Sequence, residues 1–420
     1  MCRVGTRSSH AHRSQLPDDG EMPAPHAISY FANTNARVPD RRFGIKQSDR
    51  LHHVYVIGRT GTGKSTLLET LALQDMESGR GVAVIDPHGD LVDRLVQAVP
   101  EGRKNDLRYF NAPDDTQPFG YNPLRGVRAD KVPLAASGLL DAFKKLWSDA
   151  WGTRMEHVFR NALYALIEYG EASLPDVLQL LTHPGFRAKV MQRVANEQVR
   201  MFWLQEFPHY NPRYRQEAIA PIQNKVGALL ADPRLYRILV GPSVDLHFRK
   251  LMDESRILLV NLAKGRFGED SANLLGAILV STLGLAALSR ADLDPERRRP
   301  FFIYVDEFQS FTTLAVANMI SEVRKYGVGL VLAHQHLFQL EEDVRHAVLG
   351  NVGTVIAFRI GPEDARVMAR EFAPKFSPED LVNLPNHDIY LKLMIDGTPS
   401  PPFSATTLSP DALAGEDASP

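Results

Sequence analysis

Residues 54–75, VYVIGRTGTGKSTLLETLALQD, decide the fold of this chain. The apolar run Val54–Ile57 is followed by Gly58-Arg59-Thr60-Gly61-Thr62-Gly63-Lys64-Ser65, which matches the pattern G-x-x-x-x-G-K-[ST] in full. Residues that favour a helix come next. A strand, a glycine-rich loop and a helix in this order predict a phosphate-binding loop rather than a chance glycine-rich turn.

This loop predicts a site for ATP and Mg²⁺. Its glycines let the backbone wrap around a phosphate, and its N–H groups and the following helix N-terminus supply positive potential. We expect Lys64 to reach the β and γ phosphates, Ser65 to bind Mg²⁺ and Thr66 to help hold the α phosphate.

A second apolar run ends in two carboxylates. Residues 301–307 read FFIYVDE, so Asp306 and Glu307 follow the run directly. At the carboxyl end of a parallel strand, Asp306 is suited to hold Mg²⁺, and Glu307 to orient and deprotonate a water. The pair predicts hydrolysis of ATP; the plainer alternative is a strand that ends in a solvated acidic turn.

Asp86 and Gln335 also end apolar runs. Asp86 is a candidate nucleotide-site residue, although Asp86-Pro87-His88-Gly89 suits a simple turn almost equally well. An amide at Gln335 can sense the γ phosphate. The neighbouring His334 and His336 lack nearby carboxylate or cysteine partners for a metal, so we expect them at the surface or at an interface.

Arg324 lies in Val323-Arg324-Lys325-Tyr326-Gly327, before the run that leads to Gln335. On a helix at this position it cannot easily reach its own nucleotide. Two interpretations stay open: an arginine finger inserted into a neighbouring subunit, or a solvated basic helix end.

The rest of the chain predicts an α/β fold with a mostly parallel central sheet and an inserted all-α domain. Apolar runs typical of strands buried on both faces are Val54–Ile57, Val82–Ile85, Ile257–Leu262, Phe302–Val305, Leu330–Ala333, Val355–Phe358 and Tyr390–Ile395. Helical periodicity replaces them between about residues 127 and 250. We therefore expect a disordered tail at 1–27, a nucleotide-binding domain at 28–126 and 251–407, an all-helical insertion at 127–250, and a second tail at 408–420.

Composition sets limits on function. The formal net charge is −2, so contact with DNA has to come from local basic clusters, such as Arg297-Arg298-Arg299 or the arginines of the helical insertion. A single cysteine excludes a disulfide framework and suits the cytoplasm. Leu274–Leu288 is apolar but shorter than the ~20 residues that a bilayer needs, which predicts a buried core helix and no intrinsic membrane span.

Taken together, FANTNARVPDRRFGIKQSDRLHHVYVIGRTGTGKSTLLETL, AVIDPHGDLVD, IYVDEFQSF, VRKYGVGLVLAHQ and NVGTVIAFRIGPEDARVMAREF resemble the ATPase domain of type IV secretion coupling proteins. That family comprises conjugative DNA-transfer ATPases within the HerA/FtsK group of DNA translocases. The resemblance covers roughly residues 30–407. It implies a RecA-like homohexameric ring that hydrolyses ATP at subunit interfaces and holds single- or double-stranded DNA in its channel.

The resemblance also implies residue roles: Lys64 and Ser65 at phosphate and Mg²⁺, Asp306 and Glu307 at metal and water, Gln335 as sensor and Arg324 as the neighbour's finger. Partners would include DNA and relaxosome or secretion-channel proteins. Coupling proteins usually begin with membrane-spanning helices, and here the phosphate loop comes before any such segment fits. A cytoplasmic motor, either free or recruited to the inner face of the membrane by a partner, is therefore as plausible as a secretion gate.

Two other functions stay open. One is a secretion ATPase that drives protein export without DNA. The other is a nucleotide-gated scaffold that hydrolyses nothing, against which Glu307 argues, because a pure switch needs no carboxylate that activates water.

Overall fold

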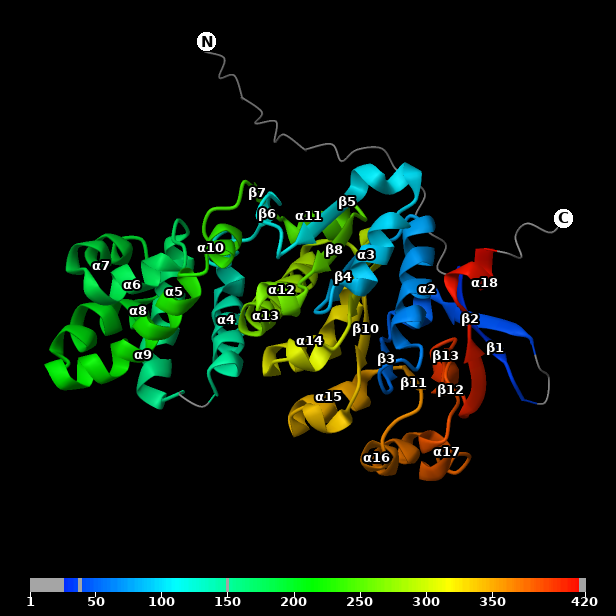
Figure 1. Ribbon diagram of the computed structural model, residues 1–420. Coiled ribbons are helices and arrows are strands. Elements are labelled where there is room, and N and C mark those ends of the chain that lie inside the picture. Colours follow the sequence, from blue (N-terminus) through cyan, green and yellow to red (C-terminus); the bar gives the residue numbers. More distant parts are fainter. Residues whose placement is uncertain (1–25, 37–39, 149–150, 415–420) are drawn as a thin grey trace, which may run out of the picture.

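The structure, a computed structural model, describes residues 26–36, 40–148 and 151–414. Its centre is an 11-stranded sheet with strand order β2-β1-β15-β12-β11-β3-β10-β9-β4-β8-β5 (Figure 1). Strands from β11 to β5 pair in parallel, and strands from β2 to β11 pair antiparallel. The predicted α/β fold with a mostly parallel sheet is confirmed.

With the exception of β5, the parallel strands coincide with the apolar runs of the sequence. They are β3 (Val54–Ile57), β4 (Gly81–Asp86), β5 (Leu107–Asn111), β8 (Ile257–Asn261), β9 (Phe301–Val305), β10 (Val328–His334) and β11 (Thr354–Ala357). The edge strand β5 was not predicted, because its LRYFN sequence carries only a short and partly polar run.

Alternate residues of these strands pack into two separate cores. Val54 and Val56 face α2 (Lys64–Glu77) and α3 (Asp90–Gln97), whereas Tyr55 and Ile57 face the other layer of helices. That second layer contains α4 (Val132–Leu146), α13 (Glu269–Ser289) and α14 (Leu314–Glu322) (Figure 1). The parallel strands are thus covered on both faces, which explains their continuous apolar sequences.

Most of the predicted helical insertion lies beyond α4, on the side away from the sheet (Figure 1). Its further helices are α5 (Thr153–Tyr169), α6 (Pro175–Thr182), α7 (Pro184–Met191), α8 (Glu197–Met201), α9 (Pro212–Leu230) and α10 (Pro233–Leu239). Trp203 is fully buried among them. The strands β6 (Phe119–Gly120) and β7 (Val244–Asp245) pair with each other where the chain enters and leaves these helices, and α11 (Phe248–Asp253) leads back to β8.

The apolar segment Leu274–Leu288 forms part of α13. The extended helical stretch Glu269–Asp292 is the one helix of the described residues that is long and apolar enough to cross a membrane by composition, and 72% of its most apolar window is buried. Its neighbours are α4, α11 and α14.

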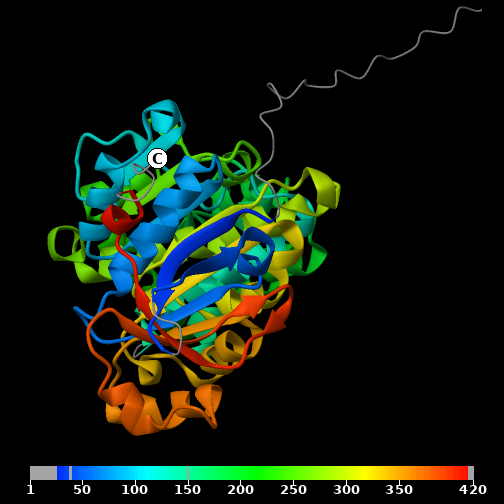
Figure 2. The same ribbon diagram turned by 90° about the vertical axis from the view of Figure 1, so that its right-hand side faces the viewer.

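The antiparallel flank departs from the prediction. Tyr390–Ile395 was expected to be one parallel strand, but β12 (Asp388–Lys392) runs antiparallel to β11 and ends before a separate short hairpin, β13 (Met394–Ile395) with β14 (Thr398–Pro399). The flank is completed by β1 (Ile28–Thr34), β2 (Arg42–Lys46) and β15 (Phe403–Thr407) (Figure 2). These strands alternate between buried and partly exposed residues, so no continuous apolar run marks them.

Short helices complete the chain. They are α1 (Gln47–Arg50), α12 (Lys264–Phe267), α15 (Glu342–Asn351), α16 (Pro362–Phe372), α17 (Pro378–Val382) and α18 (Pro410–Ala414). The expected disordered tails lie outside the described residues at 1–25 and 415–420. Within the second of them, however, α18 is helical and packs near α2.

Candidate nucleotide-binding site

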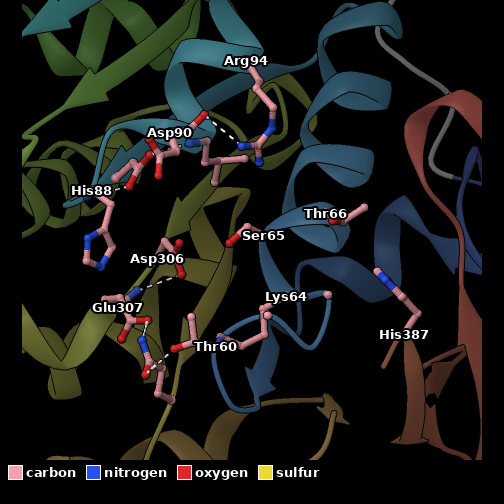
Figure 3. A pocket seen from close by; sticks show the side chains of 15 residues that line it. Thr60, Lys64, Ser65, Thr66, His88, Asp90, Arg94, Asp306, Glu307 and His387 are labelled. Atoms are coloured by element: carbon pink, nitrogen blue, oxygen red, sulfur yellow. Dashed lines mark hydrogen bonds between the residues drawn. The ribbon is translucent and has the colours of Figure 1, made fainter. Parts of the chain in front are cut away.

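A cavity of about 480 Å³ opens at the carboxyl ends of β3, β4 and β9 (Figure 3). It is lined by Thr60, Gly61, Gly63, Lys64, Ser65, Thr66, Asp86, His88, Asp90, Leu91, Arg94, Asp306, Glu307, Gln335 and His387. The phosphate loop and the two carboxylates, more than 240 residues apart in sequence, therefore share one cavity. Gly58, Arg59 and Thr62 belong to the loop but do not line the cavity.

The conformation of the phosphate loop depends on its glycines and on a contact with His387, which lies outside the loop. Gly63 has φ 118°, a left-handed conformation that side chains rarely adopt, and a Cβ there would lie 2.9 Å from Nδ1 of His387. The backbone N–H of His387 donates to the carbonyl of Thr62 at 2.9 Å. Directly after Gly63, α2 begins and points its N-terminus into the cavity, which is the geometry that attracts a phosphate.

Lys64 lies at the floor of this loop. Its Nζ donates to the carbonyl oxygens of Gly58 at 2.6 Å and Arg59 at 3.2 Å. Burial lowers the pKa of Lys64, while the carboxylates of Glu307 and Asp306 act in the opposite direction. The ammonium is therefore partly desolvated and lies beside neutral acceptors, an arrangement that suits an incoming phosphate.

Asp306 is nearly buried and surrounded by like charge. Burial, and then the carboxylates of Asp86 and Glu307, raise its pKa to about 7, and Lys64 opposes this rise. The Ser65 side chain points toward Asp306 across the opening (Figure 3). The hydroxyl oxygen of Ser65 and the carboxylate of Asp306 are ligands that fit Mg²⁺, and the charge of the ion would offset the repulsion between Asp306 and the carboxylates beside it.

Glu307 is bridged to the phosphate loop. Its backbone has φ 46°, and its Oε1 accepts a hydrogen bond from Nε2 of Gln335 at 2.5 Å. Oε1 of Gln335 in turn accepts from the hydroxyl of Thr60 at 2.9 Å. The second carboxylate oxygen of Glu307 accepts from Nε2 of Gln309 at 2.8 Å. Gln335 thus lies between the loop that would hold a γ phosphate and the carboxylate beside it.

Asp86 combines the two arrangements that the sequence left open. It lines the cavity, and its carboxylate accepts backbone hydrogen bonds from His88 at 2.8 Å, Leu91 at 2.9 Å and Val92 at 3.2 Å. It therefore fixes the turn into α3 while it contributes negative charge near Asp306.

Arg324 lies far from the cavity of its own chain. It belongs to a 3₁₀ turn, Val323–Tyr326, rather than to the expected α-helix, and its exposed guanidinium contacts Nδ1 of His52 at 2.7 Å. The seven residues of β10 separate this turn from Gln335, a span of about 20 Å at the usual rise of a strand.

The expectation that His334 lies at the surface is wrong. Its side chain is fully buried, and Nε2 lies 2.5 Å from the hydroxyl of Tyr55. Burial lowers the pKa of His334 to about 3. As the last residue of β10 it still belongs to the sheet, and the strand's alternation turns it toward the interior.

Sequence reasoning missed His387 and Arg94. His387 comes from the loop before β12, and Arg94 comes from α3, where its Nε donates to Glu69 of α2 at 2.7 Å. Neither residue belongs to a recognisable motif; only the fold brings them to the cavity.

Comparison with known proteins agrees with the fold. The sequence model of one protein family, the type IV secretion-system coupling protein DNA-binding domain, matches residues 43–376. No curated protein matches the chain. The solved structure of the bacterial conjugative coupling protein TrwBdeltaN70, in its unbound monoclinic form, has a TM-score of 0.63 at 18% identity, covering 90% of this chain and 88% of that one.

Two further solved structures share the fold. The plasmid coupling protein TrwB in complex with ADP and Mg²⁺ has a TM-score of 0.63 at 17% identity, covering 87% of both chains. VirB4 of Thermoanaerobacter pseudethanolicus has a TM-score of 0.62 at 14% identity, covering 92% of this chain and 98% of that one. At such identities these likenesses establish the fold alone.

Proposed function

The chain belongs to the type IV secretion-system coupling protein DNA-binding domain family, and we propose that it is an ATP-hydrolysing motor that moves DNA. One observation carries the proposal: Lys64 and Ser65 of the phosphate loop line the same cavity as Asp306 and Glu307. A phosphate-binding group and a pair of carboxylates facing one opening are the parts that hydrolysis of a nucleoside triphosphate requires.

Each residue has a role in this proposal. The amides of Gly61, Gly63, Ser65 and Thr66 and the ammonium of Lys64 bind the phosphates, because these residues line the cavity, whereas the N–H groups of Gly58 and Arg59 donate to backbone carbonyls instead. Ser65 and Asp306 hold Mg²⁺, which would neutralise phosphate charge. Glu307 accepts a proton from the attacking water. Gln335, hydrogen-bonded to Thr60 and Glu307, reports the presence of the γ phosphate. Asp86 stiffens the turn beside this site.

We further propose a homohexameric ring in which Arg324 completes the site of an adjacent subunit. Its exposure and its separation from the cavity of its own chain support this role, because such a side chain can act only in trans. Arg324→Ala should then lower turnover without changing nucleotide affinity, and mixing Arg324→Ala with Lys64→Ala subunits should restore part of the turnover.

The DNA component rests on family membership. Several arginines suggested by the sequence are engaged within the fold: Arg187 with the carbonyls of Leu180 and Leu181, Arg193 with Glu171, Arg213 with Glu217, Arg215 with the carbonyl of Pro208, and Arg298 with the carbonyls of Leu293 and Lys325. Arg297 is exposed at the end of the 3₁₀ turn Pro295–Arg297 before β9 and remains a candidate for phosphate contact.

The test is ATP turnover with and without single- and double-stranded DNA. We expect turnover that DNA stimulates. Glu307→Gln should abolish turnover while retaining ATP binding, and Glu342→Gln, an exposed carboxylate on α15, is the matched control. Absence of turnover by the native chain under both conditions would refute the motor and favour the scaffold.

Salt dependence separates DNA movement from protein export. If the chain neutralises DNA phosphates, its affinity for DNA should fall steeply between 50 and 200 mM salt, by a factor of roughly 10³ for six contacts. An export motor would hydrolyse ATP and show no such binding. Cytoplasmic location, recruitment to the inner membrane face and contact with relaxosome or secretion-channel proteins belong to this same proposal.

A further inference from the structure

The side chain of Lys145 connects the helical insertion to the loop behind Glu307. Lys145 is the penultimate residue of α4, and its Nζ donates to the main-chain carbonyls of Gln309 and Thr312, the latter at 2.7 Å. These two carbonyls belong to the loop that follows the catalytic carboxylate. The contact therefore joins a helix of the insertion to the nucleotide-binding part of the chain.

The loop held by Lys145 is short and closely packed. The Thr312 hydroxyl donates to the carbonyl of Phe308, which closes the turn. Phe311 packs so tightly over Gly276 of α13 that a Cβ on Gly276 would lie 2.3 Å from its ring. A displacement of the carbonyl of Gln309 therefore moves the whole turn rather than one peptide group.

Gln309 carries this connection into the site. Its Nε2 donates to Oε2 of Glu307 at 2.8 Å, and Glu307 continues through Gln335 to Thr60. A continuous chain of hydrogen bonds thus leads from α4 to the phosphate loop, with the carboxylate of Glu307 in its middle.

The environment of Lys145 indicates a specific contact. Burial lowers its pKa to about 8, against the opposing charge of Glu341. The adjacent Lys144 is exposed and lies 3.6 Å from Glu156, as expected for a surface lysine. Desolvating an ammonium costs free energy, so the two carbonyl contacts have to offset that cost.

On the other side, α4 is packed into the insertion. The ring of Phe143 lies edge-on to Phe159 of α5 with centroids 5.1 Å apart, and stacks on Trp147 at 4.9 Å. Because α4 packs against α13 and α14 as well as α5, it links the rest of the insertion to the helix layer on the sheet and to the loop that Lys145 contacts.

We propose that Lys145 is a positioning residue through which the helical insertion sets the orientation of Glu307, and thereby the rate of hydrolysis. This inference rests on the proposed function. Lys145 contacts neither the phosphate loop nor the cavity, so its loss should change turnover and leave nucleotide binding intact.

The experiment compares Lys145→Met with Lys144→Met, the same substitution one residue earlier on α4. We expect Lys145→Met to lower kcat about tenfold, because both charge-assisted hydrogen bonds to the loop are lost, with the Kd for ATP within twofold of the native value. Stimulation by DNA should disappear. Lys145→Arg should recover part of kcat because it keeps a cationic donor, and Lys144→Met should behave like the native chain.

Thermal unfolding of each variant separates positioning from loss of fold. Native kcat and native DNA stimulation in Lys145→Met would overturn the inference. So would an equal fall of kcat in Lys144→Met and Lys145→Met, or a fall explained by a lower folded fraction.

A second measurement does not depend on turnover. Binding of a non-hydrolysable ATP analogue with Mg²⁺ should change amide hydrogen exchange in α4 of the native chain and not in Lys145→Met. A native chain that binds nucleotide but hydrolyses none would refute the proposed function, whereas an unaltered exchange response in Lys145→Met would refute the connection itself.

Discussion

The same helix and the same strand carry two charged clusters of opposite character. At the cavity, α2 begins with Lys64 and β9 leads to Asp306 and Glu307. Farther along α2, Asp75 accepts hydrogen bonds from Arg50 at 2.5 and 2.8 Å, from Arg80 at 3.0 Å and from the Tyr304 hydroxyl of β9 at 2.6 Å.

The two clusters differ in how their charges are balanced. Asp75, Arg50 and Arg80 are buried, and both arginines pair with Asp75; the pKa of Arg50 is raised because Asp75 and Tyr304 outweigh its burial. In the cavity, by contrast, the pKa of Lys64 is lowered and that of Asp306 is raised. Each cavity group is therefore held in an environment that disfavours its charge.

The difference in charge balance indicates that the buried cluster serves stability and the cavity cluster serves ligand binding. The buried cluster sets one carboxylate against two guanidiniums, which also bond to the neutral side chains of Ser29 and Gln47, and its bond to Tyr304 joins α2 to β9. The cavity cluster lacks a counter-charge that a phosphate and a divalent cation would supply. Substitutions in the first cluster should lower stability, and substitutions in the second should lower activity.

The largest expected effect belongs to Lys64. Lys64→Ala removes the cation that binds the phosphates, and we expect turnover to fall at least about 10³-fold. The melting temperature should stay within a few degrees of the native value, because a partly desolvated lysine contributes little to stability. Turnover and differential scanning calorimetry measure both, and a large fall in melting temperature would contradict the proposed separation.

The second effect is on stability. Asp75→Asn leaves two buried arginines without their counter-ion, so the free energy of unfolding should fall by about 3–5 kcal/mol, measured by urea denaturation. Asp106→Asn is the matched control: Asp106 also pairs with two arginines, Arg103 and Arg256, but it is only partly buried. The control should lose about 1 kcal/mol or less. Equal losses would contradict the role of burial.

A smaller effect is expected at the bridge between the loop and the carboxylate. Gln335→Ala removes the hydrogen bonds to Thr60 and Glu307, so kcat should fall roughly 10- to 100-fold with little change in nucleotide affinity. Gln339→Ala, an exposed glutamine in the next turn, should be silent. A fall in affinity without a fall in kcat would assign Gln335 to binding instead.

The smallest effect concerns neutral buried groups, which belong to neither cluster. Burial lowers the pKa of His53 to about 4 and that of His334 to about 3. Above pH 6.5, about the pKa of a histidine in the unfolded chain, both histidines are neutral in the folded and in the unfolded chain. Below that pH the unfolded chain binds protons that the folded chain does not, so the free energy of unfolding falls as the pH falls. Between pH 7.5 and 5.5 each histidine should contribute a loss of about 1.4 kcal/mol.

Urea denaturation at the two pH values tests this expectation. His334→Gln should reduce the difference between them by about 1.4 kcal/mol, whatever its own effect on stability. His183→Gln, at an exposed histidine, serves as the control. An unchanged difference in His334→Gln would show that His334 takes up its proton in the folded chain.

The sequence was informative where physical constraints act over short distances. Val54–Ile57 and Phe301–Val305 are buried on both faces, so every residue is apolar and the strands stand out. The glycine pattern and the carboxylates of the cavity follow those strands directly, which is why Lys64, Ser65, Asp306 and Glu307 could be named in advance, and Gln335 directly follows the equally buried strand β10.

The features that the sequence did not predict depend on contacts between segments that are distant in the chain. β1 and β15 are half-covered strands whose alternating residues resemble loops, and His387 reaches the cavity only because β12 follows it. His334 was misjudged because polar character suggested the surface, whereas the pairing of β10 with β3 and β9 encloses it. Lys145 had no local signal either, since its partners are carbonyls 164 residues or more away.

The position of β15 between β1 and β12 bears on how the chain is made. During synthesis, β1 and β2 leave the ribosome well before β15, the strand that pairs with the other edge of β1. That edge of β1 can therefore be paired only after about residue 407 has left the ribosome. Until then the inner edges of β1 and β12 offer unpaired backbone groups to other nascent chains. Insertion of this last strand would close the sheet, and a ribosome stalled before Phe403 should hold a protease-sensitive, aggregation-prone intermediate.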